Sequence, residues 1–217
     1  VAGELGLKVW LQAGYMPSAI PDLEDEHTHR VLVRRGRDEP AEEGDRLVHR
    51  EDGYAYYWRK FEHVLDLLKP AAVREYLRQA YEETWLKRFG DSFGNTVETI
   101  WVDEPHFRPP LLPWNEELPE VFAKRWGYSL IEHVAALYAP VGDYQHVRHH
   151  YWRTVTDMFM EAYFAEIGRW CAAHGVKFGG HAMGEDSLHA QISWTGAAMR
   201  CYEHMQLPGI DHLTLSL

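Results

Sequence analysis

The chain has 217 residues, of which 46% are hydrophobic and 25% charged, a composition that supports a packed core and argues against disorder. Its formal net charge of −11 argues against nucleic acid as a partner, because phosphate binding requires a basic surface. No apolar run reaches about 18 residues, so the sequence predicts no transmembrane helix and no membrane partner.

Four segments make up the first half of the chain. Residues 8–11 are a short apolar run that predicts a buried strand, and residues 25–32 predict a short helix. Residues 34–52 are charged and poor in apolar side chains, which indicates a surface excursion or hairpin over residues 34–58 that ends in a strand near residues 54–58. From Pro70, which suits a first helical turn, apolar residues recur at helical spacing until Gly90 ends the helix.

Strands and helices alternate in the second half of the chain. Strands are predicted at residues 97–102, 176–180 and 210–215. Helices are predicted at residues 118–126, 130–137, 144–174 and 190–205, and a proline-rich loop at residues 106–114. The order strand, helix, strand implies parallel strands joined by right-handed crossovers.

Acidic side chains follow two of the predicted strands. Asp103 and Glu104 come after the strand at 97–102, and Glu185 follows the strand at 176–180. Because parallel barrels carry their active sites at the C-terminal rim of the strands, we expect Glu104 and Glu185 to face one cleft. Glycoside cleavage needs two carboxyl groups, one as proton donor and one as nucleophile or base. We predict Glu104 as the donor, Glu185 as its partner and Asp103 in a supporting role, since neighbouring strand residues point to opposite sides.

These residues also have plain structural interpretations. Asp103 and Glu104 would form a polar turn before Pro105, and Glu185 with Asp186 would cap the following helix. Aromatic and polar side chains near the same rim are candidates for sugar binding or, equally, for packing under loops. The candidates for substrate binding are Trp10, Gln12, Tyr15, His106, Trp114 and His181.

Seven short segments that span nearly the whole chain carry a resemblance to a known family: residues 6–11, 65–73, 102–105, 112–114, 148–153, 180–185 and 207–211. They resemble the catalytic barrel of bacterial glycoside hydrolases related to family 106, the α-L-rhamnosidase-like enzymes. The resemblance implies an α/β fold in which the chain covers about strands 2 to 6 of a (β/α)8 TIM-type barrel. It also implies a secreted or periplasmic multidomain enzyme acting on glycans, Glu104 as proton donor at the fourth strand, and calcium near the bound sugar, with no ligands assigned here.

The chain begins and ends abruptly, which predicts that residues 1–217 are a single, incomplete barrel domain with the remainder of the barrel and accessory domains elsewhere. In many barrel glycosidases the second carboxylate lies on the seventh strand, so the partner of Glu104 is either Glu185 or a residue beyond Leu217. We therefore expect little glycosidase activity from these residues alone.

Two other classes of protein remain open. A non-catalytic carbohydrate-binding or structural module derived from such a barrel would bind glycan without cleaving it. A metal-dependent hydrolase would use His146 and His150, which stand four residues apart on a predicted helix. No glutamate is placed as in H-E-x-x-H, so we assign no metal ligand.

Overall fold

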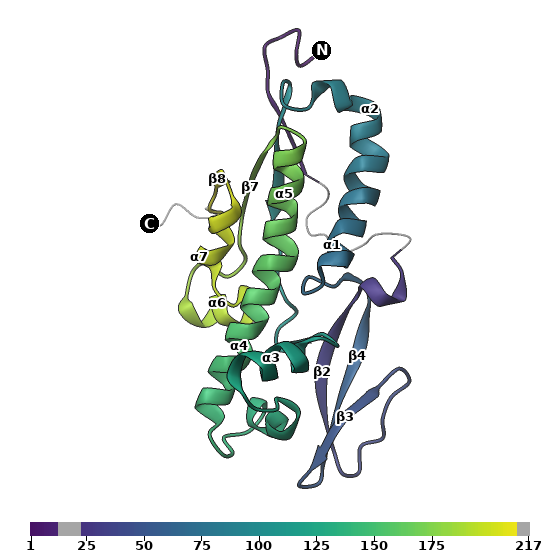
Figure 1. Cartoon of the computed structure of the whole chain (residues 1–217), viewed down its shortest axis with the longest axis vertical. Helices are drawn as coiled ribbons and strands as arrows, with labels where there is room; N and C mark the ends of the chain where they lie inside the picture. The colour runs from purple at the N-terminus through teal and green to yellow at the C-terminus, as the bar shows by residue number, and fades with distance from the viewer. Residues whose placement is uncertain (13–22, 212–217) are drawn as a thin grey trace.

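The computed structural model describes residues 1–12 and 23–211, without the side chains of residues 62 and 63. The chain is a mixed α/β molecule with one parallel and one antiparallel sheet, each of four strands, and long helices beside them (Figure 1). Among the described helices, none has the length and apolar character needed to span a bilayer.

The parallel sheet carries the strand ends that the sequence marks as functional. Its order is β1 (Val9–Leu11), β5 (Val97–Asp103), β7 (Lys177–His181) and β8 (Leu207–Pro208), all parallel. Ile100 and Val102 of β5 are buried in the main core. Because side chains alternate along a strand, Trp101 and Asp103 project from the opposite face.

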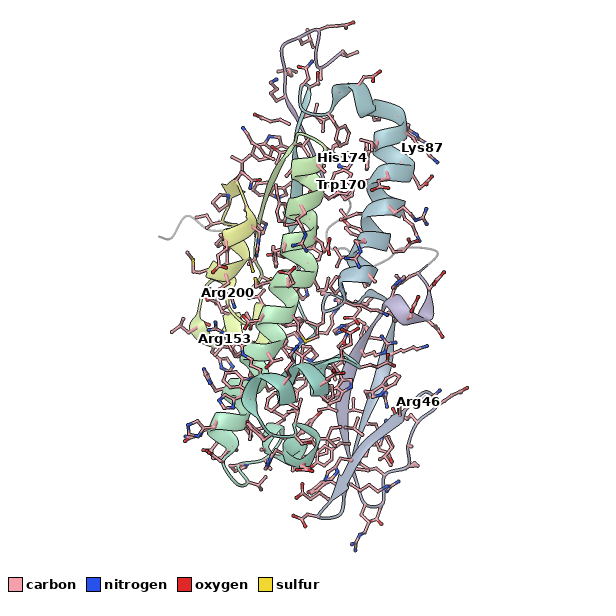
Figure 2. The ribbon with its side chains drawn as sticks, viewed as in Figure 1. Arg46, Lys87, Arg153, Trp170, His174 and Arg200 are labelled. Carbon is pink, nitrogen blue, oxygen red and sulfur yellow. The ribbon has the colours of Figure 1, made fainter. Side chains whose placement is uncertain are left out.

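Two long helical rods pack beside this sheet (Figure 1). One runs continuously through α1 (Pro70–Leu77), the π-helical η2 (Arg78–Leu86) and α2 (Lys87–Phe89). The other runs through α4 (Tyr144–Phe159), the π-helical η5 (Met160–Ala165) and α5 (Glu166–Ala173). Trp170 of α5 points toward the first rod (Figure 2), where its indole donates a hydrogen bond of 2.9 Å to Glu82 and its ring lies 5.4 Å from that of Tyr81.

The antiparallel sheet has the order β3 (Arg46–Glu51), β4 (Tyr54–Leu65), β2 (Thr28–Gly36) and β6 (Leu112–Trp114). Leu32 and Tyr56 on one of its faces are almost fully buried and belong to the same hydrophobic cluster as Ile100 and Phe178 of the parallel sheet. The two sheets therefore share one core.

Shorter helices complete the described chain. They are η1 (Asp25–His27), η3 (Gly90–Ser92), α3 (Leu118–Trp126), η4 (Ile131–Leu137), α6 (Leu188–Thr195), α7 (Ala198–Cys201) and η6 (Tyr202–His204). Segment 34–58, expected as a surface excursion or hairpin, supplies the end of β2, all of β3 and the start of β4.

Several expectations meet a clear outcome. The parallel pairing of consecutive strands is present, and the fold is α/β; the four described strands form an open sheet, so a barrel is not shown. The helix expected at 25–32 is wrong, because only one turn forms before β2 begins at Thr28. The last strand of the described residues lies at Leu207–Pro208, ahead of the expected 210–215, of which residues 212–215 lie outside the described part. Gly179 permits this pairing, since an added Cβ would lie 2.9 Å from the carbonyl oxygen of Leu207.

Candidate functional site

The C-terminal ends of β1, β5 and β7 bring three predicted site residues into direct contact. Asp103 pairs with His181 in the parallel register, and its Oδ1 lies 2.6 Å from Nε2 of His181. Gln12, directly after β1, donates a hydrogen bond of 3.1 Å to Oδ2 of the same carboxylate. Both oxygens of Asp103 are thus held, one from each neighbouring strand.

Glu104 occupies the first position beyond β5 with an unusual backbone. Its φ is 47°, in the left-handed region that side chains other than glycine rarely adopt. The amide of Glu104 donates to the carbonyl of His181 at 3.2 Å, and its carbonyl lies 2.6 Å from Nδ1 of His106. This conformation is therefore fixed from both sides, and the side chain remains half-buried at the strand end.

His106 acts as a fixed support for Glu104. Burial lowers the pKa of His106, which favours the neutral ring. A carbonyl oxygen can only accept, so the proton lies on Nδ1 and is donated to Glu104. The ring also meets Trp194 of α6 edge-on at 4.9 Å, while the amide of Phe107 donates to the Trp194 carbonyl at 2.8 Å.

Glu185 lies in the loop after β7, and its side chain is positioned by other residues than those around Asp103 and Glu104. Its Oε1 accepts a hydrogen bond from the hydroxyl of Tyr202 in η6 and lies 3.4 Å from the amide of Ala182. Burial and the adjacent carboxylate raise the pKa of Tyr202 well above its usual range, so the hydroxyl stays protonated and donates. No sequence pattern identifies Tyr202, because it lies 17 residues from Glu185 within a stretch expected to be one helix.

An aromatic pair covers part of the same face of the sheet. Trp10 is 52% exposed and stacks on Trp101 with ring centroids 5.1 Å apart and planes 16° from parallel. The ring of Trp101 lies over Gly179 and Gly209, where an added Cβ would come within 3.1 and 2.7 Å of it. Trp101 is not among the site residues predicted from the sequence, although its place two residues before Asp103 puts both on one face of β5.

One of the predicted substrate-binding residues does not join this group, and another cannot be placed. Trp114 lies in β6 of the antiparallel sheet and is only 2% exposed, so it offers no ring face to a sugar. Its three-residue strand pairs with β2, a contact that its position in a proline-rich sequence did not indicate. Tyr15 lies outside the described residues.

Candidate metal ligands in the described chain are few. Atoms of Glu24, Glu26 and His27 lie within 4.8 Å of one another around η1. Two exposed carboxylates and a ring nitrogen differ from the six to eight oxygens that calcium takes, so this group does not fit calcium.

His146 and His150 are engaged separately. Nδ1 of His146 lies 2.8 Å from the carboxylate of Asp143, whereas Nδ1 of His150 lies 2.9 Å from the hydroxyl of Tyr128. The ring of His150 stacks on Trp126 with centroids 3.7 Å apart. These contacts give His150 a packing role and leave His146 exposed beside Asp143, and they give no support to a zinc site.

Comparison with known proteins gives a similarity of fold. No family model and no curated protein matches the sequence. A solved structure, a rhamnosidase from Novosphingobium sp. PP1Y, superposes on 72% of this chain with a TM-score of 0.54 and 17% sequence identity. The chain spans 16% of that protein's length. At this identity the likeness concerns the fold alone.

Proposed function

We propose that this chain forms part of the barrel-type catalytic domain of a glycoside hydrolase, with Glu104 as the proton donor. The observation that carries the proposal is the left-handed backbone of Glu104 at the end of β5. Such a conformation costs about 1–3 kcal/mol and persists where the surroundings enforce it, typically at functional sites. Here the carbonyl of His181 and the ring of His106 enforce it.

The contacts around Glu104 separate the roles of the carboxylates. Asp103 uses one oxygen for His181 and the other for Gln12, so it acts as a positioning residue for His181. Glu104, the next residue along the chain, is the carboxyl that we propose donates a proton to the leaving oxygen. Glu185, oriented by Tyr202, is the candidate second carboxylate within this chain.

The fuller form of the proposal is an α-L-rhamnosidase-like enzyme whose remaining barrel strands and accessory domains lie outside these 217 residues. This choice of sugar follows the sequence resemblance to α-L-rhamnosidase-like enzymes, and the fold shared with a rhamnosidase is consistent with it. Trp10, with its exposed ring, is placed to stack on the apolar face of a sugar.

A first test measures the strain at Glu104. Glu104→Gly should raise the free energy of unfolding by about 0.5–1 kcal/mol, because glycine adopts a positive φ without steric cost. Asp52, with a φ of 48° in the turn between β3 and β4, provides the control. Asp52→Gly should stabilise the chain to a similar extent while leaving any glycan-dependent property unchanged. A loss of stability in Glu104→Gly would show that its backbone is not strained.

A second test measures catalysis in the full-length protein with an aryl α-L-rhamnoside as substrate. Glu104→Gln keeps the shape of the side chain and removes its proton, so kcat/KM should fall by about 100-fold or more. Binding of the substrate should be largely kept. Unchanged hydrolysis would exclude Glu104 as the proton donor.

A non-catalytic carbohydrate-binding module is the second candidate, favoured by the exposed stacked ring of Trp10. Its signature would be glycan binding that is lost in Trp10→Ala, combined with no hydrolysis in either the wild type or Glu104→Gln.

A further inference from the structure

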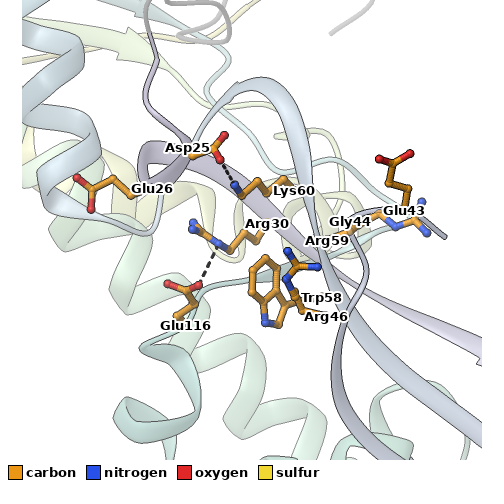
Figure 3. A pocket seen from close by; sticks show the side chains of 10 residues that line it. All are labelled: Asp25, Glu26, Arg30, Glu43, Gly44, Arg46, Trp58, Arg59, Lys60 and Glu116. Atoms are coloured by element: carbon orange, nitrogen blue, oxygen red, sulfur yellow. Dashed lines mark ion pairs between the residues drawn. The ribbon is translucent and has the colours of Figure 1, made fainter. Parts of the chain in front are cut away.

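A cavity of about 660 Å³ lies at the antiparallel sheet (Figure 3). None of the residues that line it belongs to β1, β5 or β7. Its walls are built from η1, β2, β3, β4, the connection between β2 and β3, and the loop before α3. The volume falls in the range of about 300–1,000 Å³ that small-molecule sites occupy.

Strand register places an aromatic ring among basic side chains on one face of this sheet. Trp58 of β4 pairs with Arg46 of β3, and two residues further along β4 Lys60 pairs with Arg30 of β2. Residues two apart on a strand share a face, so all four side chains project to the same side. The guanidinium of Arg30 lies over the Trp58 ring at 5.3 Å.

Arg30 is a buried cation whose donors are poorly satisfied. It is 4% exposed, and its Nε has no hydrogen-bond acceptor in the structure. Asp66 and Glu116 each approach it only to 3.7 Å, beyond hydrogen-bond length, while Nη1 donates to the carbonyl of Thr28 at 3.0 Å. A buried donor without an acceptor is costly, which points to an acceptor supplied by a ligand.

The charges around the cavity balance. The four basic side chains are Arg30, Arg46, Arg59 and Lys60, and the four carboxylates are Asp25, Glu26, Glu43 and Glu116. A charged ligand of either sign would meet like charges on these walls. A neutral polyhydroxylated ring instead offers hydroxyl groups that accept from guanidinium groups and donate to carboxylates.

We propose that this cavity binds a neutral glycosyl residue. Trp58 provides the apolar surface for the C–H face of the sugar, Arg30 and Arg46 donate to its oxygens, and Glu116 accepts from a hydroxyl. The site is separate from the strand ends around Glu104 and does not depend on catalysis there. It would hold a sugar unit of a glycan remote from the bond that is cleaved.

The test follows the indole N–H resonance of Trp58 by NMR, assigned by its disappearance in Trp58→Phe. The probes are the methyl glycosides of L-rhamnose, D-galactose and D-glucose, with D-glucuronate as a charged comparison. At least one neutral glycoside should shift the resonance in a saturable way, and D-glucuronate should bind more weakly. No shift with any neutral glycoside at saturating millimolar concentration, or tighter binding of D-glucuronate, would overturn the proposal.

Variants then locate the binding. Glu116→Ala and Arg46→Ala each remove one partner of the sugar and should raise Kd by about 10-fold. Both side chains are exposed, so the fold should be kept. Arg88→Ala, an exposed arginine on α2, is the matched control and should leave Kd unchanged. Glu104→Gln should also leave Kd unchanged, so a failure here is distinguishable from a failure of the catalytic proposal. Equal Kd values in Glu116→Ala, Arg46→Ala and the wild type would contradict the assignment.

Discussion

His29 and Asp66 are ionisable side chains that the fold buries almost completely, and each is shifted toward its neutral form. Burial, with smaller contributions from the charges of Arg108 and Arg30, lowers the pKa of His29 to about 3. Burial raises the pKa of Asp66 to about 6, although Arg30 and two hydrogen bonds oppose the shift. Neither ring nitrogen of His29 has a hydrogen-bond partner.

The two shifts act on stability in opposite directions as pH changes. The folded pKa of His29 lies below its ordinary value of 6.5, so the stability it contributes is full above pH 6.5 and is lost as pH falls toward 3. The folded pKa of Asp66 lies above its ordinary value of 3.8, so its contribution is full below pH 3.8 and is lost as pH rises through about 6.

Replacing His29 separates its contribution to the pH dependence of stability from that of Asp66. In His29→Phe the acid-sensitive group is gone, so below pH 6.5 the wild type should lose up to about 1.4 kcal/mol per pH unit relative to the variant. Urea unfolding at several pH values between 7.5 and 4.5 gives the two profiles. The exposed His189→Phe is the control, and its profile should follow that of the wild type. Parallel profiles for His29→Phe and the wild type would contradict the assignment.

The sequence located part of the candidate site at residue level. The strand-end positions of Asp103, Glu104 and His181 could be predicted because each stands at the end of an apolar run that predicts a strand, and parallel pairing then sets Asp103 beside His181. The hydrogen bond from Tyr202 to Glu185 forms because η6 folds back onto the loop after β7, and no local sequence pattern predicts that contact. Alternation along β5 places Trp101 on the face of Asp103, but the packing of its ring over Gly179 and Gly209 depends on the register with the neighbouring strands.

Elements with a strong local pattern were predicted closely, whereas those that need a distant partner were not. The helical period at 144–174 is local, and the rod from α4 to α5 follows it to Ala173. The acidic start at Asp25 imitates a helix N-terminus and does give one turn, η1. The β-branched residues that follow are then taken into β2, because β4 pairs with them along almost its whole length.

The junction between α6 and α4 depends on one glycine. Gly196 ends α6 with a φ of 79°, and an added Cβ would lie 1.9 Å from Oγ1 of Thr156 on α4. Gly196→Ala should therefore cost about 3 kcal/mol or more, from both the backbone strain and the overlap. Gly142, with a φ of 53° and open space around it, is the matched control, and Gly142→Ala should cost about 1 kcal/mol. Equal losses in thermal unfolding would show that α6 can move away from α4.

At the level of the whole molecule, one hydrophobic cluster joins both sheets and both helical rods. Leu32 and Tyr56 come from the antiparallel sheet, Ile100 and Phe178 from the parallel sheet, and Phe159 from α4 between them. None of these side chains is more than 2% exposed. Neither sheet therefore has a separate core that would let it remain folded when the other unfolds.

We accordingly expect the chain to unfold in a single cooperative transition. Backbone amides of Leu32 in β2 and Ile100 in β5 should exchange with solvent at the same free energy of opening, because each requires global unfolding. Tyr56→Ala removes a large buried side chain and should cost about 3–5 kcal/mol. The amide of Ile100, on the other sheet, should report the full loss. An opening free energy for Ile100 that stays at the wild-type value while that of Leu32 falls would mean that the two sheets unfold independently.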